Sequence, residues 1–171
     1  SPLLLKSFSV PISIYPVKGY SATFKIRDSK LAPKISLTDD QHKLVISRLG
    51  DKLRVAGKYE IGGFTRELNM NQCNAITDRI SILFPDVCDF KNPFYWSGLR
   101  PFTPSNKPYI GKTINSNLFL NTGHGALGWT MACGSGKAIT DIINGYKPDV
   151  DFDFLGMNED YPSQKYNLSA N

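Results

Sequence analysis

The stretch Asn117-Leu-Phe-Leu-Asn-Thr-Gly-His-Gly-Ala-Leu-Gly-Trp-Thr130 decides how the second half of this chain is interpreted. Its apolar start predicts a short buried strand over residues 117–121. Three glycines follow within the next seven residues, and the pattern over residues 127–144 predicts a helix that ends at Gly145. The stretch therefore predicts a strand, a glycine-rich turn and the start of a helix.

Such a turn suits a ligand. Glycines at 123, 125 and 128 let a flat or anionic group approach the backbone, and free N–H groups point at it from the positive end of the helix dipole. A tight turn without any ligand is the alternative. Residues 123–128 also fit the spacing Gly-x-Gly-x-x-Gly, but only one helix follows, so they do not open the βαβ unit of a dinucleotide site.

The helix after the turn is rich in small residues, including Cys133, Gly134, Ser135 and Gly136. Each glycine costs a helix about 1 kcal/mol relative to alanine. Close packing against a sheet or a cofactor is the expected compensation.

Upstream of the turn, Arg100 lies between an expected strand over residues 94–100 and a loop containing Pro101, Pro104 and Pro108. A guanidinium with so little freedom suits bidentate recognition of a carboxylate. The alternative is a structural arginine that pairs with an internal acid or stacks on Trp96.

The first half predicts an antiparallel meander. Strands are expected over residues 11–26, with a bend or bulge at 16–20, and then over 34–37, 44–48 and 53–57. Residues 69–84 change to a helical period, with Asn71 as the expected N-cap and Ile76, Ile80, Leu83 and Phe84 on the face that covers the sheet.

Composition excludes several classes of protein. The chain has 171 residues, 41% of them hydrophobic and 20% charged, and no apolar run long enough to cross a membrane. Residues 1–10 show no targeting segment. The net charge is +5, but the basic residues are scattered, and most are expected on the wet face of the sheet, Lys18 among them. This pattern predicts no nucleic-acid partner and leaves weak attraction to anionic lipid as an alternative.

Three cysteines, Cys73, Cys88 and Cys133, are widely spaced. An odd count at this spacing favours neither a disulfide framework nor a metal site. Cys133 is expected to act as a small hydrophobic residue in its helix, and a reducing, intracellular setting is the simpler interpretation.

Four motifs occur together in a recognisable order: Pro16-Val-Lys-Gly-Tyr-Ser21, Gly98-Leu-Arg-Pro-Phe-Thr-Pro104, Pro108-Tyr-Ile-Gly111 and the turn from Gly123 to Thr130. In order and spacing they resemble the D-amino acid oxidase-like superfamily of FAD-dependent oxidoreductases. Within it, the chain is most similar to the bacterial D-amino acid dehydrogenase small subunits. The likeness covers residues 1–150.

The resemblance implies an α+β fold that lacks the N-terminal dinucleotide-binding part. Residues 1–9 would end a connection from the FAD domain, and residues 10–97 would form the substrate domain, an antiparallel sheet with a flanking helix. Residues 98–146 would be the C-terminal strand–turn–helix return into the Rossmann-like FAD domain, and residues 147–171 a tail.

The resemblance also implies roles for individual residues. Arg100 would bind the substrate carboxylate as the catalytic residue, with Tyr20 and Trp96 as pocket walls, although aromatic residues in a sheet are more often core. The remaining residues would bind FAD: Gly98, Gly123, His124, Gly125, Ala126, Leu127, Gly128, Trp129 and Thr130. His124 would contribute its backbone and need not act as a base.

The implied reaction is oxidation of D-amino acids to 2-oxo acids and ammonia by hydride transfer to flavin. The implied partners are a D-amino acid, a quinone or another membrane electron acceptor, and the absent N-terminal FAD-binding segment. The setting would be cytoplasmic, with peripheral association at the inner face of the bacterial inner membrane as a further option. Two alternatives stay open: a glycine or sarcosine oxidase-like enzyme that uses oxygen, and a catalytically inert fragment or interaction module.

Overall fold

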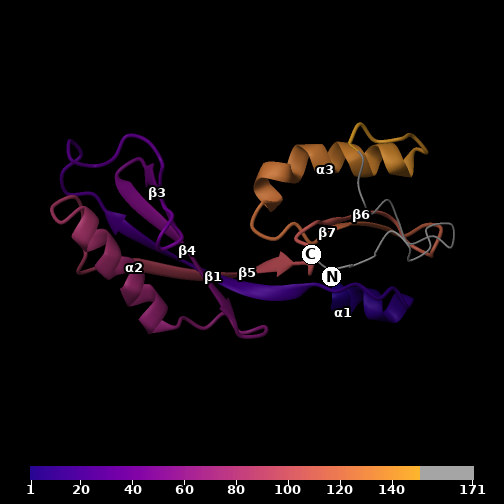
Figure 1. Ribbon diagram of the computed structural model, residues 1–171, viewed down its shortest axis with the longest axis horizontal. Coiled ribbons are helices and arrows are strands. Elements are labelled where there is room, and N and C mark those ends of the chain that lie inside the picture. Colours follow the sequence, from indigo (N-terminus) through magenta and orange to yellow (C-terminus); the bar gives the residue numbers. More distant parts are fainter. Residues whose placement is uncertain (151–171) are drawn as a thin grey trace. The chain divides into compact units, whose positions relative to one another are not determined.

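The computed structural model describes residues 1–150 (Figure 1). The described part forms two units. Pro16–Leu99 make up one, and Ser1–Tyr15 together with the chain from Arg100 onward make up the other. The expected tail begins at residue 147, and all of it beyond residue 150 lies outside the described residues.

The first unit is built on a five-stranded antiparallel sheet of order β2-β3-β4-β1-β5. Its strands are β1 (Tyr15–Lys25), β2 (Leu37–Asp39), β3 (Leu44–Leu49), β4 (Lys52–Ile61) and β5 (Phe94–Phe102). The helix α2 (Met70–Leu83) lies along this sheet (Figure 1). The α+β class and the antiparallel sheet with its flanking helix are therefore confirmed.

The core of this unit lies between α2 and one face of the sheet. Cys73, Ile76 and Ile80 of the helix are buried against strand residues such as Phe24 and Val55. Full burial of one such aliphatic side chain contributes about 1.5–3 kcal/mol. Covering the sheet is thus a sufficient reason for α2 to form. Leu83 does not join this core, because 39% of it is exposed.

The N-cap of α2 is Asn69, and the expectation of Asn71 is wrong. Asn69 has an extended backbone, and its Oδ1 accepts a hydrogen bond from the Asn71 N–H at 3.1 Å. That geometry satisfies one of the N–H groups that the first helical turn leaves without a partner. Two asparagines separated by one residue compete for the cap, and the backbone conformation selects the first.

The register between β1 and β4 shifts between Lys18 and Tyr20, where a bend or bulge of the long strand was expected, but the bulge is not in that strand. The extra residue belongs to the partner strand β4, where Lys58 has a φ of +58°. The expected strand over residues 34–37 is wrong, because β2 begins only at Leu37 and pairs with β3 through Asp39.

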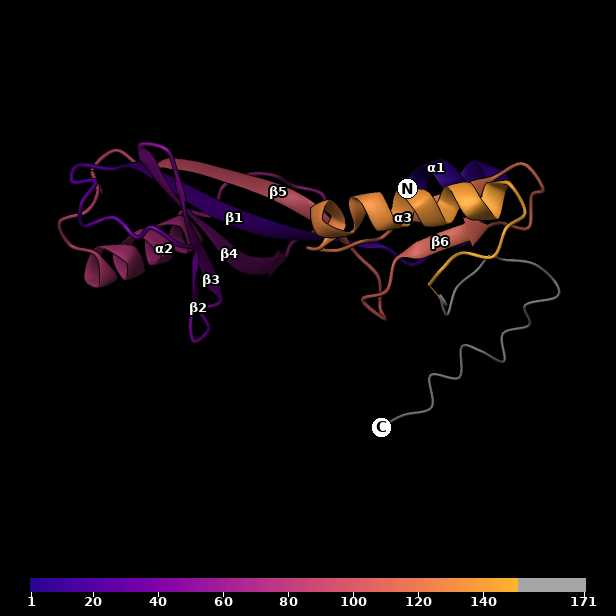
Figure 2. The same ribbon diagram turned by 90° about the horizontal axis from the view of Figure 1, so that it is seen from above.

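The second unit holds α1 (Pro2–Leu5), the two-stranded sheet of β6 (Tyr109–Lys112) and β7 (Phe119–Thr122), and α3 (Gly128–Ile143). Helix α3 runs along β6 (Figure 2). The short helix at the N-terminus and β6 were not expected. The region expected as a proline-rich loop is partly strand, because β5 continues through Pro101 to Phe102. An edge strand tolerates a residue without an N–H group.

The turn-and-helix prediction is confirmed as local structure. The chain passes from β7 through Gly123, His124 and Gly125 to α3, and Gly145 follows the helix with a φ of +79°. Assignment of residues 98–146 to a Rossmann-like FAD domain, and of residues 10–97 to a substrate domain, stays a prediction.

The cysteines and lysines bear on two expectations. Cys73 and Cys88 are buried free thiols, and burial raises the pKa of Cys88 to about 11. Cys133 is exposed, so it does not pack as a small hydrophobic residue within the described part of the chain. Lys18 is only 2% exposed, and its expected place on the wet face of the sheet is wrong.

Candidate functional site

The turn between β7 and α3 depends on backbone conformations that favour glycine. Gly123 has a φ of +85° and Gly125 a φ of +54°. A Cβ added at Gly123 would also lie 2.6 Å from Cγ2 of Thr103. Side chains are excluded here by both strain and space, which explains why the sequence places glycines on either side of His124.

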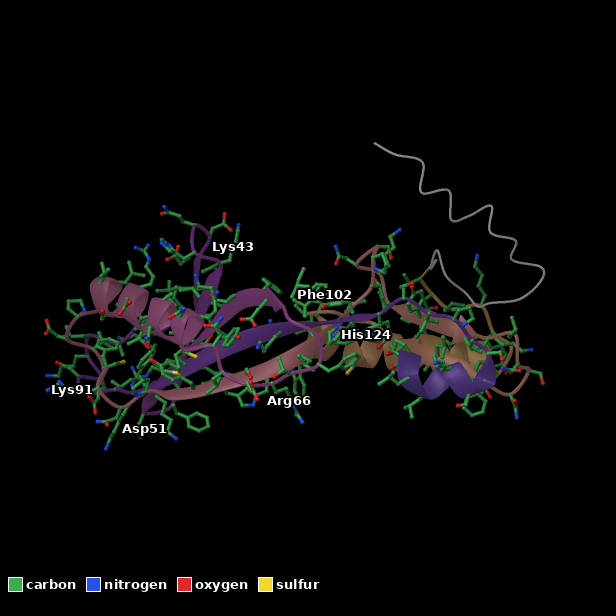
Figure 3. The ribbon with its side chains drawn as sticks, turned by 90° about the horizontal axis from the view of Figure 1, so that it is seen from below. Lys43, Asp51, Arg66, Lys91, Phe102 and His124 are labelled. Carbon is green, nitrogen blue, oxygen red and sulfur yellow. The ribbon has the colours of Figure 1, made fainter. Side chains whose placement is uncertain are left out.

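The turn is tied to the end of β5. The Gly125 N–H donates to the Pro101 carbonyl at 2.9 Å, and Phe102 forms a β-bridge with His124. Figure 3 shows Phe102 and His124 next to each other. Because β5 carries Arg100 directly before these residues, the same strand fixes the turn and the predicted carboxylate-binding residue.

The N-terminus of α3 has no side-chain cap. Its N-cap residue is Leu127, whose side chain has no atom that could accept a hydrogen bond, and no acidic residue lies in the first turn. The first N–H groups of a helix have no partner inside the helix and carry its positive dipole end. Leu127 and Trp129 are 60% and 96% exposed, so apolar surface surrounds this helix start.

His124 has one buried ring atom, Nε2, with no hydrogen-bond partner among residues 1–150. Removal from water lowers the pKa of His124, so the ring is neutral near pH 7. A buried polar atom without a partner costs free energy, and such atoms are rare in folded proteins. This nitrogen is therefore a candidate to form a hydrogen bond with a ligand or with another segment of protein.

A cavity of about 280 Å³ borders this turn. Ile14 and Thr103 line it and also contact the position of Gly123. The other lining residues are Ser13, Tyr15, Phe102 and Pro104. Its wall is mostly apolar, which suits a ring system more than a solvated ion.

Trp96, Gly98 and Arg100 occupy every second position of β5 and therefore lie on the same face of the strand. An added Cβ at Gly98 would overlap the Trp96 indole, so the ring lies directly over this glycine. Trp96 is 51% exposed, and Arg100 is half-buried. The structure thus brings Trp96 and Gly98 into contact.

Tyr20 lies in the core, where its hydroxyl donates to Glu60 Oε2 at 2.6 Å. Burial, followed by this hydrogen bond, raises the pKa of the Tyr20 phenol. The predicted site residues divide between the two units. Tyr20, Trp96 and Gly98 belong to the sheet unit, and Arg100 and the turn belong to the other. Their binding roles stay predictions.

Sequence reasoning missed the polar group around Lys18, Glu60 and Ser97. No local pattern reveals it, because the bulge at Lys58 is what turns Glu60 toward Lys18, and a positive φ at a lysine has no sequence signature. Residues 1–150 hold no cluster of histidine, cysteine and carboxylate side chains that suits a metal ion.

Comparison with known proteins gives a consistent result. The sequence matches the family of FAD-dependent oxidoreductases known as DAO over residues 1–142. It is 54% identical over 155 residues to the D-amino acid dehydrogenase of Dechloromonas aromatica, covering 91% of this chain and 37% of that protein. The corresponding enzyme of Rhizobium rhizogenes is 46% identical over 151 residues, covering 88% of this chain and 36% of that protein.

Among solved structures, glycine oxidase from Geobacillus kaustophilus has a TM-score of 0.73 at 23% identity, covering 86% of this chain and 40% of that one. Iminodiacetate oxidase from Chelativorans also has a TM-score of 0.73, at 16% identity, covering 92% of this chain and 44% of that one. These likenesses show the fold. The chain spans little more than a third of the length of the curated relatives named above.

Proposed function

Because this chain belongs to the DAO family of FAD-dependent oxidoreductases, we propose that it is the C-terminal portion of a D-amino acid dehydrogenase. The whole enzyme would oxidise D-amino acids to 2-oxo acids and ammonia. The relatives that are 54% and 46% identical to this chain over the aligned residues carry that name.

The turn from Gly123 to Thr130 is the observation that carries the proposal. It combines an uncapped N-terminus of α3 with a buried His124 Nε2 that has no partner among the described residues. Donors at a helix start stabilise negative charge, and reduced flavin gains negative charge at the pyrimidine edge of its ring. These features fit that edge of FAD, and the backbone N–H groups of residues 128–130, in the first turn of α3, would face it.

Bound FAD would supply the hydride acceptor. Arg100 would bind the substrate carboxylate through its guanidinium fork and orient the substrate, which is chiefly a positioning effect. The hydrogen on Cα would leave as hydride with both electrons of the Cα–H bond, and the lone pair of the neutral amine would form the C=N bond in its place. Water then adds to the imino carbon and ammonia leaves. This route needs no strong base from the protein.

Trp96, lying over Gly98, would form one wall of the substrate site. Tyr20 would support the substrate site without contacting the substrate, because its ring is buried and its hydroxyl is bound to Glu60. We assign the direct contact with the carboxylate to Arg100 alone.

Electrons would pass from flavin to a quinone or another membrane acceptor, with the enzyme at the cytoplasmic side of the membrane. No helix within residues 1–150 combines the length and apolar character that a membrane span requires. Peripheral contact through basic and apolar surface residues would bring the enzyme to its acceptor.

The test measures bound flavin and oxidation of D-alanine by this chain, alone and mixed with a separately produced segment matching the uncovered part of the relatives. Flavin and activity should appear only in the mixture, because the turn would contact only one end of the cofactor. Flavin bound by the chain alone would contradict this division of the site. A mixture with neither flavin nor activity would favour the inert fragment.

A further inference from the structure

Strand β4 has an alternating sequence that its structure follows only in part. Its apolar side chains occupy every second position, at Leu53, Val55, Tyr59 and Ile61. Its charged side chains lie between them, at Lys52, Arg54, Lys58 and Glu60. Such alternation predicts a strand that turns all of its apolar residues to the core and all of its charged residues to solvent.

The second half of β4 has the opposite arrangement. Leu53 and Val55 are fully buried on the face that packs against α2, as the pattern predicts. Beyond them, Tyr59 is 55% and Ile61 77% exposed, whereas the charged side chain of Glu60 is only 25% exposed. The end of the strand therefore turns its apolar side chains away from the core.

The bulge in β4 causes this inversion. Tyr20 lies opposite Gly57, but Lys18 lies opposite Glu60, so that two residues of β4 face Gly19 alone. One extra residue in a strand exchanges the faces of all residues that follow it. We call this arrangement the bulged register. In a straight register, Lys18 would lie opposite Tyr59.

The bulged register has two unfavourable features that the straight register would avoid. It places Lys58 at a φ of +58°, in the left-handed region that a residue with a Cβ adopts at a cost. It also leaves the large apolar side chains of Tyr59 and Ile61 exposed, and their burial would be favourable. Another interaction must therefore favour the bulged register.

The polar group around Lys18 provides that interaction. Its Nζ lies 2.9 Å from Glu60 Oε1 and donates to the Glu67 carbonyl at 3.0 Å, and its side chain is only 3% exposed. Glu60 Oε2 accepts hydrogen bonds from the Tyr20 hydroxyl at 2.6 Å and from Asn69 Nδ2 at 3.3 Å. These contacts require Glu60 on the face toward α2. Buried ion pairs often add little stability, and the selection of one register is their best-supported role.

We propose that the Lys18–Glu60 ion pair is a register lock, which holds the end of β4 in the bulged register against the straight register that its own sequence favours. Without Lys18, Glu60 would be a buried charge without a cation, and the straight register would move it to solvent. The lock thereby keeps Tyr59 and Ile61 on the open face of the sheet, opposite α2. This inference is independent of the proposed function, because it concerns the sheet unit alone.

Alkylation of a thiol at position 61 tests the register in this chain. Ile61→Cys is made in a Cys133→Ser background, because Cys133 is exposed whereas Cys73 and Cys88 are buried. Iodoacetamide should label position 61 rapidly when the lock is intact. Lys18→Met should slow this labelling by about tenfold or more, because the straight register turns position 61 toward α2.

Two further variants sharpen the test. Lys25→Met is the matched control, since Lys25 is an exposed lysine of the same strand, and it should leave the labelling rate unchanged. Lys58→Gly should act in the opposite direction, because glycine adopts a positive φ without strain. Added to Lys18→Met, it should raise the labelling rate by about threefold or more. No recovery would overturn the competition between two registers.

Cys73 and Cys88 report whether the variants stay folded, because both thiols are buried in the core of the sheet unit. If they stay unlabelled in Lys18→Met while position 61 keeps its original rate, the register lock is overturned. If they become labelled, Lys18→Met has unfolded, and Lys18→Gln decides. Glutamine keeps a hydrogen-bond donor for Glu60 but removes the charge, so labelling should slow by about threefold or more. An unchanged rate in Lys18→Gln would overturn the proposal.

Discussion

Arg100 lies on the face of β5 that also carries Trp96 and Gly98, and the next two residues bind the turn. If it binds the substrate carboxylate, its loss leaves that charge without a partner, at a cost of about 2–5 kcal/mol. In a full-length enzyme, Arg100→Ala should therefore lower kcat/KM for D-amino acids by about two orders of magnitude or more, mainly through KM.

Arg27→Ala is the control for this prediction, because Arg27 is an exposed arginine that pairs with Asp89 at the surface. It should leave steady-state kinetics within about twofold of wild type. An unchanged KM in Arg100→Ala would remove Arg100 from the site.

Gly123 permits a second prediction for a single residue. Gly123→Ala forces a side chain onto a φ of +85° and places its Cβ against the Thr103 methyl. Strain of this kind costs about 1–3 kcal/mol, and urea unfolding of the chain should show a loss of that size. Combination with Thr103→Ser, which removes the methyl, should restore the steric part. Equal stability of the single variant and wild type would contradict the geometry of the turn.

At the scale of elements, α3 contains glycines that its surroundings in this chain do not require. A Cβ at Gly134 would meet no atom within 4 Å, and the residue is exposed. The packing expected to compensate for this glycine is therefore not provided by residues 1–150. Gly134→Ala should raise the free energy of unfolding of this chain by about 1 kcal/mol, measured with urea.

Gly134→Ala in a full-length enzyme should have a different effect from the same substitution in this chain alone. If another segment or the cofactor packs closely on this face of α3, the added methyl should reduce flavin content. A gain in stability with full flavin content would show that the face stays open.

The contact between the β2–β3 turn and α2 should depend on pH. Arg79 donates to Asp39 Oδ2 at 2.6 Å, and His42 also binds this carboxylate. The arginine, followed by the hydrogen bonds of His42, holds the pKa of Asp39 at about 2 against an ordinary value of 3.8. Since the folded-state pKa is depressed, the contribution is present above about pH 4. It should be lost as pH falls toward 2.

Stability curves of wild type and Asp39→Asn should accordingly converge between pH 4 and pH 2 in acid titrations followed by circular dichroism. Asp40→Asn is the control, because the Asp40 side chain is exposed and pairs with Lys43 at the surface. A constant difference between wild type and Asp39→Asn across this range would contradict the assignment.

At the scale of the whole molecule, the electron acceptor separates the dehydrogenase from an oxidase-like enzyme. Stopped-flow measurements on the reduced full-length enzyme should show flavin reoxidised at least ten times faster by a soluble quinone than by dissolved oxygen. Rapid reoxidation by oxygen would favour the glycine or sarcosine oxidase-like alternative. The solved oxidases share the fold at low identity, so the fold does not distinguish the two.

The features that could be predicted from the sequence alone are those that local chemistry controls. Glycines at 123, 125 and 145 take the positive φ values that a turn and a helix end require, and the helical period of Ile76 and Ile80 predicted the face that α2 buries. The motif order also pointed to the flavoenzyme family, because motifs of this kind lie within continuous stretches of chain.

The features that depend on residues distant in the sequence became visible only in the folded chain. Lys18 looked like one more basic residue on a wet strand, and only the bulge at Lys58 and the carbonyl of Glu67 explain why it is buried. Asn69 prevailed over Asn71 as the cap because of its backbone angles. His124 was expected only as part of a glycine-rich turn, and packing made its Nε2 a buried atom without a partner among the described residues. Desolvation and long-range pairing act between segments, so no local pattern records them.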